Sequence, residues 1–272
     1  MSTRLPVTRS LVLPYALSLL IAILLILASA GGLLYQDAFY PTAALRASFV
    51  ANDVVNLSIG LPVLLGSLWL ARRGRLLGLL FWPGALFYVL YNATAYLFAL
   101  PLNVAFLLNL LLVTATVYTM AALVSSIDAQ AVGKTLSGTV PERMAASALF
   151  LLGVAYFLLS AVMFAGAVVN QAPLGAVERA THVADFLIAP AYVIGGLLLW
   201  RRQPLGYVAG MGLLFQASML FVGLIVFLLL QPLISMEPFE PVDVVVVAIM
   251  GLVCFIPFAL FARGVLANEH VS

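Results

Sequence analysis

Two stretches of this chain decide its fold: DVVNLSIGLPVLLGSLWLARR (residues 53–73) and HVADFLIAPAYVIGGLLLWRR (residues 182–202). Each stretch opens with two polar residues three positions apart, continues as a long apolar run and ends in an arginine pair. Four positions correspond at an offset of 129 residues: Asp53 with His182, Asn56 with Asp185, Arg72 with Arg201, and Arg73 with Arg202. This repeated pattern predicts a duplicated membrane-spanning unit whose polar positions differ between the copies.

The correspondence continues beyond the arginine pairs at a slightly different offset. Three further pairs match at 128 residues: Gly78 with Gly206, Gly84 with Gly212, and Phe87 with Phe215. The simplest interpretation is the loss of one residue from the loop after the arginines. Pro62 and Pro190 lie before the arginines yet also match at 128, so the register within that apolar run stays open.

The composition places the chain in lipid. Apolar residues make up 65 % of the sequence, charged residues only 8 %, and the mean hydropathy is +1.19. Soluble domains carry roughly 25 % charged residues, so 272 residues of this composition could not cover a globular surface with polar groups. The single cysteine, Cys254, excludes a disulfide within one chain.

Eight apolar runs are long enough to cross a bilayer, which takes about 20 residues each. They fall near residues 11–34, 54–71, 76–99, 103–124, 144–169, 180–200, 205–230 and 243–262. The predicted fold class is therefore an all-α polytopic integral membrane protein. Its predicted parts are a first four-helix half (1–124), a cytoplasmic linker (125–143) and a second four-helix half (144–272). Because each half holds an even number of spans, the two repeats run parallel.

The cations predict the orientation. With the N-terminus inside, ten of the 12 Lys and Arg residues fall on the inner side: Arg4, Arg9, Arg72, Arg73, Arg75, Lys134, Arg143, Arg201, Arg202 and Arg263. Only Arg46 and Arg179 fall outside, where most of the acidic residues lie. The positive-inside rule then predicts an inner or plasma membrane location with both termini in the cytoplasm.

Five polar residues form a candidate site near the outer ends of two spans: Asp53, Asn56, Glu178, His182 and Asp185. Residues three or four apart share a helix face, so the members on each span can converge. Such a group could bind a solute or ion, gate protons through the imidazole, or hold a divalent cation such as Zn or Mn between His182 and Asp185. The structural alternative makes Asn52 or Asp53, and Thr181, helix caps, with the other carboxylates solvated at the interface or paired between the halves.

A second polar stripe follows the third span, with Tyr88, Tyr91, Asn92 and Tyr96 at helical spacing. Asn109 and Gln216 offer further uncharged polar groups on other spans. Such residues either hydrogen-bond neighbouring helices or line a pocket for a neutral or lipid-like molecule.

The spans lack the residues that several cofactors need. The only lysine, Lys134, lies in the linker, so a retinal Schiff base inside the bundle is excluded. The two histidines are His182 and His270, and only His182 lies in a span, so one chain cannot supply two axial ligands to an embedded haem. The cofactor is otherwise unknown, and a divalent metal remains open. The arginine pairs indicate topology and not nucleic-acid binding.

Three functions fit these observations. The first is a permease or channel for a small solute or cation, with an acidic outer vestibule that concentrates cations. The second is a non-catalytic membrane subunit or sensor that organises partners. The third is a membrane-embedded enzyme with an outward-facing His and Asp site, which works either with or without a metal ion. The expected partners are the lipid bilayer and either further copies of this chain or a membrane complex.

Overall fold

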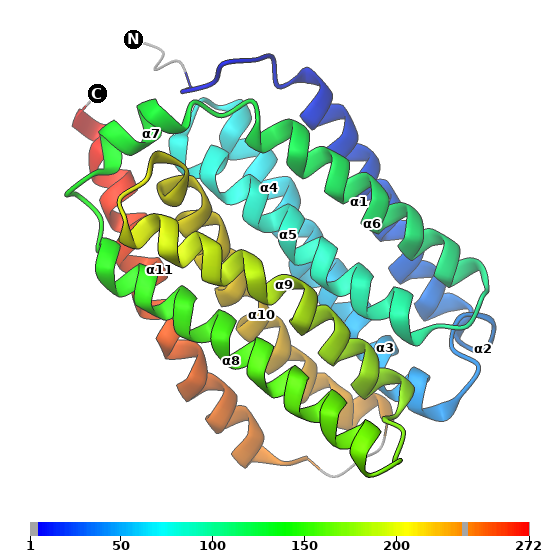
Figure 1. The fold of residues 1–272 in the computed structure, drawn as a ribbon. Helices are drawn as coiled ribbons and strands as arrows, with labels where there is room; N and C mark the ends of the chain where they lie inside the picture. The colour runs from blue at the N-terminus through cyan, green and yellow to red at the C-terminus, as the bar shows by residue number, and fades with distance from the viewer. Residues whose placement is uncertain (1–4, 236–238, 272) are drawn as a thin grey trace.

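The computed structural model describes residues 5–235 and 239–271, and its fold is all-helical there (Figure 1). Eight helical segments in this part of the chain are long and apolar enough to cross a membrane, which confirms the predicted number. They are α1 Val12–Leu34, α3 to α4 Ala43–Arg72, α5 Leu76–Ala99, α6 Val104–Val124, α8 Glu142–Val169, α9 Ala176–Trp200, α10 Pro204–Ser235 and α11 Pro241–Val271. The short helices α2 Gln36–Phe39 and α7 Ala129–Leu136 lie in connections. Arg4 lies outside the described residues.

The second span begins well before the predicted boundary. It consists of α3 Ala43–Val55, a π-helical turn η1 Asn56–Gly60, and α4 Leu61–Arg72. Its N-cap is Thr42, whose side chain accepts a hydrogen bond from the Leu45 amide at 3.3 Å. The capping interpretation of Asp53 is therefore wrong, because Asp53 lies inside α3.

The capping interpretation of Thr181 is also wrong. The helix that contains it, α9, begins at Ala176 with Gly175 at the N-cap position. The Thr181 hydroxyl instead donates to the Val177 carbonyl one turn earlier, at 3.1 Å. Helix α9 gains this extra turn because residues 176–180, which follow Gly175, contain no glycine or proline that would break it.

The two arginine turns have the same conformation and the same length. Arg73 has φ −78° and ψ 5°, and Arg201 has φ −82° and ψ 6°. The next residue is left-handed in both turns, with φ 77° at Gly74 and 54° at Arg202. Helices α5 and α10 then begin at the same distance from the turn. The change of offset in the sequence therefore does not arise in this loop.

Helices α5 and α10 form the centre of the bundle and contact each other along their lengths (Figure 1). Helix α5 also packs on α4, α6 and α9, while α10 packs on α3, α9 and α11. Helices α1 and α6 pair on one flank, and α8 packs on α9 and α11 on the other. The two central helices approach most closely where Gly84 faces the backbone of Gly212. Only glycine permits this approach, because a Cβ on Gly84 would lie 2.9 Å from the Gly212 carbonyl carbon.

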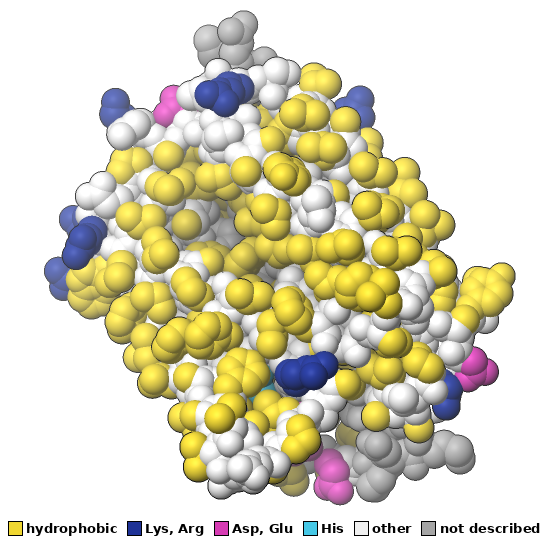
Figure 2. All heavy atoms as spheres, turned by 45° about the vertical axis from the view of Figure 1, so that its right-hand side comes forward, with side chains coloured by type: hydrophobic (Ala, Val, Ile, Leu, Met, Phe, Trp, Pro, Cys, Tyr) yellow, Lys and Arg dark blue, Asp and Glu magenta, His cyan; other side chains and the backbone are white. Residues whose placement is uncertain are grey.

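The bundle has two polar ends, which we name by their connections. The termini side holds both chain ends, the two arginine turns and residues 125–141, and the far side holds residues 35–42, 100–103 and 170–175 (Figure 1). Apolar side chains cover most of the flank between the ends in the face that Figure 2 shows. That distribution is what a multi-pass protein presents to lipid.

Two glutamates tie helices together on the termini side. Glu142, at the start of α8, pairs with Arg202 at 2.6 Å and accepts a hydrogen bond from the Tyr207 hydroxyl at 2.6 Å. Glu269, near the end of α11, pairs with Arg75 at 2.9 Å and accepts from the Leu77 amide at 2.9 Å. Each carboxylate therefore fixes the first turn of one central helix, α10 or α5.

Candidate binding cavity

A polar cavity of about 480 Å³ lies within the helical bundle. Helices α3, α5, α8, α9 and α10 all contribute to its wall. Its polar lining includes Ser48, Asn52, Tyr88, Tyr91, Asn92, Tyr156, Thr181, Asp185 and Gln231. The cavity extends from residues near the far side, such as Thr181, to Tyr88 about halfway along α5. It therefore reaches from one end of the bundle toward its middle.

Asp185 is the carboxylate of this cavity. Its side chain comes from α9, is only 7 % exposed, and accepts a hydrogen bond from the Tyr91 hydroxyl of α5 at 3.0 Å. A buried carboxylate inside a membrane bundle is costly and commonly marks a substrate or ion pathway. Of the five residues predicted to form the site at the outer ends of the spans, Asp185 is the one that lines this cavity.

His182 and Glu178 do not join Asp185. The His182 Nδ1 lies 3.4 Å from the Ser160 hydroxyl of α8, and its ring meets the Phe164 ring edge-on at 6.3 Å. Glu178 is exposed in the first turn of α9. The imidazole and the carboxylate of Asp185 thus contact different helices, although they are three residues apart. No group of three His, Cys, Asp or Glu side chains that could hold a metal ion occurs within the described residues.

Asp53 occupies a closed cage of hydroxyl groups behind the cavity wall. It is 1 % exposed and accepts hydrogen bonds from the Tyr40 hydroxyl at 2.6 Å and the Tyr96 hydroxyl at 2.9 Å. Ser29 of α1 supplies a third side-chain hydrogen bond. Gly32 of α1 leaves the room for this contact, because a Cβ there would collide with both the Asp53 carboxylate and Tyr40.

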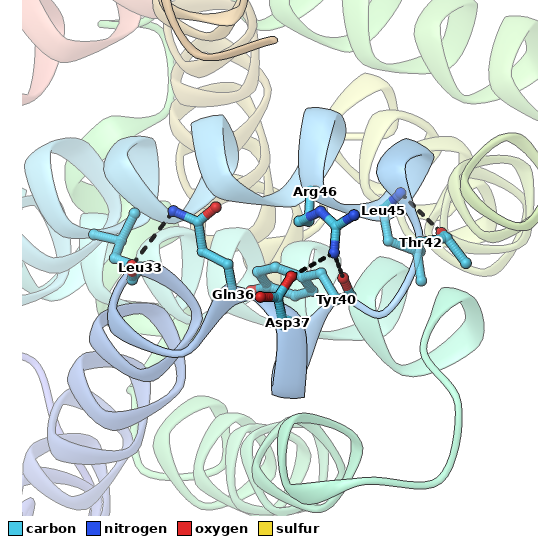
Figure 3. A network of polar contacts seen from close by, with 7 residues as sticks. All are labelled: Leu33, Gln36, Asp37, Tyr40, Thr42, Leu45 and Arg46. Atoms are coloured by element: carbon cyan, nitrogen blue, oxygen red, sulfur yellow. Dashed lines mark hydrogen bonds and ion pairs between the residues drawn. The ribbon is translucent and has the colours of Figure 1, made fainter.

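The connection between α1 and α3 holds Tyr40 in place. Arg46 pairs with Asp37 at 2.7 Å and donates to the Tyr40 carbonyl at 3.3 Å, as Figure 3 shows. Burial, followed by the nearby Asp53 carboxylate, raises the pKa of the Tyr40 phenol above its ordinary value. The phenol therefore keeps its proton and remains a hydrogen-bond donor to Asp53.

A chain of amides connects this cage to the cavity. The Asn52 amide donates to the Tyr96 hydroxyl at 3.2 Å and to the Asn92 carbonyl oxygen at 3.3 Å. Asn92 in turn donates to the Tyr88 carbonyl at 3.0 Å. Asn52 and Asn92 both line the cavity, whereas Tyr96 stands between Asn52 and Asp53. Two hydrogen bonds therefore connect Asn52 in the cavity wall to the caged carboxylate, through the Tyr96 hydroxyl.

The predicted polar stripe divides in the structure. Tyr88, Tyr91 and Asn92 line the cavity, while Tyr96 belongs to the Asp53 cage. The other candidates lie elsewhere: Asn109 donates to the Ala105 carbonyl of its own helix, Gln216 is buried and accepts from the Tyr192 hydroxyl, and Asn56 is buried in η1. Asn109, Gln216 and Asn56 therefore do not line this cavity.

Two lining residues carried little signal in the sequence. Asn52 stood beside Asp53 and was interpreted as a possible cap, although it lies on the helix face that meets α5. Tyr156 is the one polar side chain that α8 contributes to the cavity, in a span otherwise rich in Leu, Ala and Val. An isolated tyrosine in such a run has no periodic partner that would indicate its direction.

A second cavity, of about 250 Å³, is almost wholly apolar. It lies between α5, α6, α9 and α10 on the termini side of the glycine contact, with Gly84, Gly195 and Gly212 in its wall. The flank drawn in Figure 2 is hollowed between apolar side chains. This cavity offers no polar group that would orient a solute.

No protein family model, curated protein or solved structure matches this chain. The function is therefore inferred from the geometry of the cavity and of the helices around it.

Proposed function

We propose that the protein is a membrane permease for a small solute, which enters the polar cavity from the far side. The observation that carries this proposal is the position of the cavity: it lies between the two halves, opens among residues near one end, and is lined by polar groups down to the middle of α5. Secondary transporters commonly bind their substrate near the midplane, between two repeats. A solid bundle would have favoured an organising subunit instead.

The central helices close the route below the cavity. Gly84 of α5 meets the backbone of Gly212 of α10, and the side chains of Leu80, Met211 and Leu214 near this contact have no exposed surface. A path for solute to the termini side would require α5 and α10 to separate at this contact. The arrangement is thus that of a cavity accessible from one side and sealed on the other, as alternating access requires.

The proposal includes an ancestral duplication of a four-helix unit, 1–124 and 144–272. The equal arginine turns support it at an offset of 128 residues. So do two glycines, since Gly78 packs on the Leu70–Ala71 peptide and Gly206 on the Leu198–Leu199 peptide. The extra residue of the first copy then falls in η1, because a π-helical turn accommodates one more residue than an α-helical turn.

Side-chain contacts before η1 support the offset of 129. Asp53 bonds to Ser29 of α1, the first span of its half, and His182 approaches Ser160 of α8, the first span of the other half. The paired glycines of the central crossing contact each other, as residues on a pseudo-two-fold axis would. That axis would run along the membrane normal and through the seal.

The charges support the orientation of the permease. Nine of the described Lys and Arg residues lie on the termini side: Arg9, Arg72, Arg73, Arg75, Lys134, Arg143, Arg201, Arg202 and Arg263. Arg46 and Arg179 lie on the far side. We therefore propose that the termini side is cytoplasmic in an inner or plasma membrane and that the cavity faces outward.

An enzyme built on His182 and Asp185 has less support from the geometry. A general base must reach the group whose proton it takes, either directly or through one water. The His182 ring does not line the cavity and is directed to Ser160 and Phe164 of α8.

Cysteine accessibility tests the permease proposal, and its first part needs no knowledge of the solute. In a Cys254→Ala background, Thr181→Cys places a thiol at the cavity wall and Leu80→Cys places one beside the seal. A membrane-impermeant thiol reagent added to intact cells should modify Thr181→Cys and spare Leu80→Cys. The same reagent added to inside-out vesicles should begin to modify Leu80→Cys when a transported solute is supplied.

The controls for this experiment are thermal unfolding of each variant and full labelling after denaturation. Failure of the reagent to reach Thr181→Cys from outside, in a folded protein, would refute an outward-facing aqueous cavity. Modification of Leu80→Cys from outside as readily as Thr181→Cys would refute the seal.

A further inference from the structure

We propose that the cavity binds an organic ammonium ion, with Asp185 as its counter-ion and the surrounding aromatic rings as its walls. This inference rests on the proposed permease, because it names the class of solute that the same cavity takes.

The first argument is that no cation contacts Asp185. Within the described residues its hydrogen-bond donor is the neutral Tyr91 hydroxyl, and no lysine or arginine pairs with it. The His182 imidazole acts on it electrostatically, without a hydrogen bond or an ion pair between them. Both far-side arginines are engaged elsewhere: Arg46 pairs with Asp37, and Arg179 donates to the Phe98 carbonyl at 3.4 Å. Removing a carboxylate from water without a cation in contact is costly, so a cation from solution would be stabilised here.

The second argument is the aromatic wall. Six rings line the cavity together with the carboxylate: Phe49, Tyr88, Tyr91, Tyr156, Phe221 and Phe227. Aromatic faces attract alkylammonium groups electrostatically, and cages of aromatic rings recognise quaternary ammonium ligands. The rings also replace water around the alkyl groups of such a cation, which they cannot do for a strongly hydrated inorganic ion.

The third argument separates this ligand from a metal ion. Ca²⁺ and Mg²⁺ take six or more oxygen ligands, and Zn²⁺ takes three or four N, O or S ligands. The cavity offers one carboxylate, and no cluster of metal-binding side chains occurs in the described part of the chain. The monovalent charge that Asp185 can neutralise and the space of about 480 Å³ both fit a compact organic cation.

The amides in the cavity wall add a requirement for the ligand. Asn52 and Asn92 both line the cavity, and their hydrogen bonds to each other, to Tyr96 and to the Tyr88 carbonyl use only part of what the two amide groups can donate and accept. An ammonium ion that also carries a hydroxyl group can bond to these amides while its charge lies near Asp185. We therefore expect an ammonium alcohol to bind more tightly than a tetraalkylammonium ion of similar size.

The test is binding of defined probes to the purified, full-length protein, measured by thermal stabilisation and by calorimetry. The probes are tetramethylammonium, tetraethylammonium, choline and 3,3-dimethyl-1-butanol, which is the neutral analogue of choline. The cations should raise the unfolding temperature of the wild type in proportion to their occupancy, and the neutral alcohol should not. Sodium chloride at equal ionic strength controls for screening.

Two variants separate the effect of the Asp185 carboxylate on binding from the effect of acidic residues elsewhere on the far side. Asp185→Asn should weaken choline binding at least tenfold, whereas Glu178→Gln removes an exposed far-side carboxylate that does not line the cavity and should leave binding unchanged. A second measurement applies if Asp185→Asn does not fold. Choline should then protect Thr181→Cys, in the otherwise unaltered cavity, against the impermeant thiol reagent.

The outcomes distinguish this inference from the proposal beneath it. Absence of stabilisation and of protection by every ammonium probe, with normal labelling of Thr181→Cys, would reject the ammonium ligand and leave the permease standing. Equal binding of choline and its neutral analogue would also reject it. Loss of Thr181→Cys labelling itself would reject the outward-facing cavity, and the ligand with it.

Discussion

The contact between Gly84 and Gly212 makes a prediction that can be worked out from distances. In Gly84→Ala the new Cβ would lie 2.9 Å from the Gly212 carbonyl carbon and 3.1 Å from its Cα, and closer still to the carbonyl oxygen. Carbon atoms in proteins settle at about 3.5–4.0 Å from each other. All three neighbouring atoms belong to the backbone, so no side chain can rotate away, and α5 and α10 must separate by roughly 0.5–1 Å.

The cost of that separation sets the expected magnitude. Overpacking a closely packed interior costs about 1–3 kcal/mol, while alanine stabilises a helix interior by about 0.5–1 kcal/mol relative to glycine. We therefore expect Gly84→Ala to lower the free energy of unfolding by about 1–2 kcal/mol. Gly212→Ala should cost less, because its Cβ would come no closer than 3.4 Å to any neighbour.

A control substitution is available at another glycine that lies inside a membrane-spanning helix. A Cβ on Gly66 of α4 would meet nothing within 4 Å, so Gly66→Ala should be neutral or slightly stabilising. The assay is unfolding of purified protein in mixed micelles, followed by tryptophan fluorescence, for wild type and the three variants. Equal stability of Gly84→Ala and Gly66→Ala would refute the close crossing of α5 and α10 and the seal that depends on it.

Three further predictions concern the cage and the topology. Gly32→Ala sets a methyl group against the caged carboxylate and should lower the unfolding temperature, whereas Gly166→Ala, in open space, should not. Tyr40→Phe removes a donor from a buried acid and should cost about 1–3 kcal/mol in the same unfolding assay; an unchanged value would mean that the hydroxyl is dispensable. A topology reporter should score outside at Gly175 and inside at Lys134, and the reverse result would overturn the proposed orientation.

The spans could be predicted because hydropathy is summed over many residues, but their ends could not. The second span was placed too short because Arg46, Asn52 and Asp53 lower the hydropathy of its first turns. In the structure each of these has a partner from another segment: Arg46 pairs with Asp37, Asn52 bonds to Asn92, and Asp53 bonds to Tyr40. A hydropathy score treats every polar residue as unfavourable in a span, because it does not include the partner that the residue contacts in the folded protein.

The cavity was predictable to the extent that it follows helical periodicity. Tyr88, Tyr91 and Asn92 share a face of α5 and line the cavity together. His182 and Asp185 have the same spacing, yet their side chains contact α8 and α5 respectively. Spacing fixes where a side chain leaves its own helix, but the neighbouring helix decides which partner it meets, and the sequence does not give that neighbour.

On the proposed duplication, the two halves place their acids differently, and that difference gives the cavity its charge. Asp53 corresponds to His182, and both face the first span of their own half. Asn56 corresponds to Asp185, so the second half has its carboxylate three residues further along, where the cavity lies. One acid accepts hydrogen bonds from hydroxyl groups and holds helices together, whereas the other is the carboxylate that we propose as the counter-ion of a ligand. A symmetric pair of carboxylates in one cavity would repel each other and would select a divalent ion, so the single charge is what makes a monovalent cation the fitting solute.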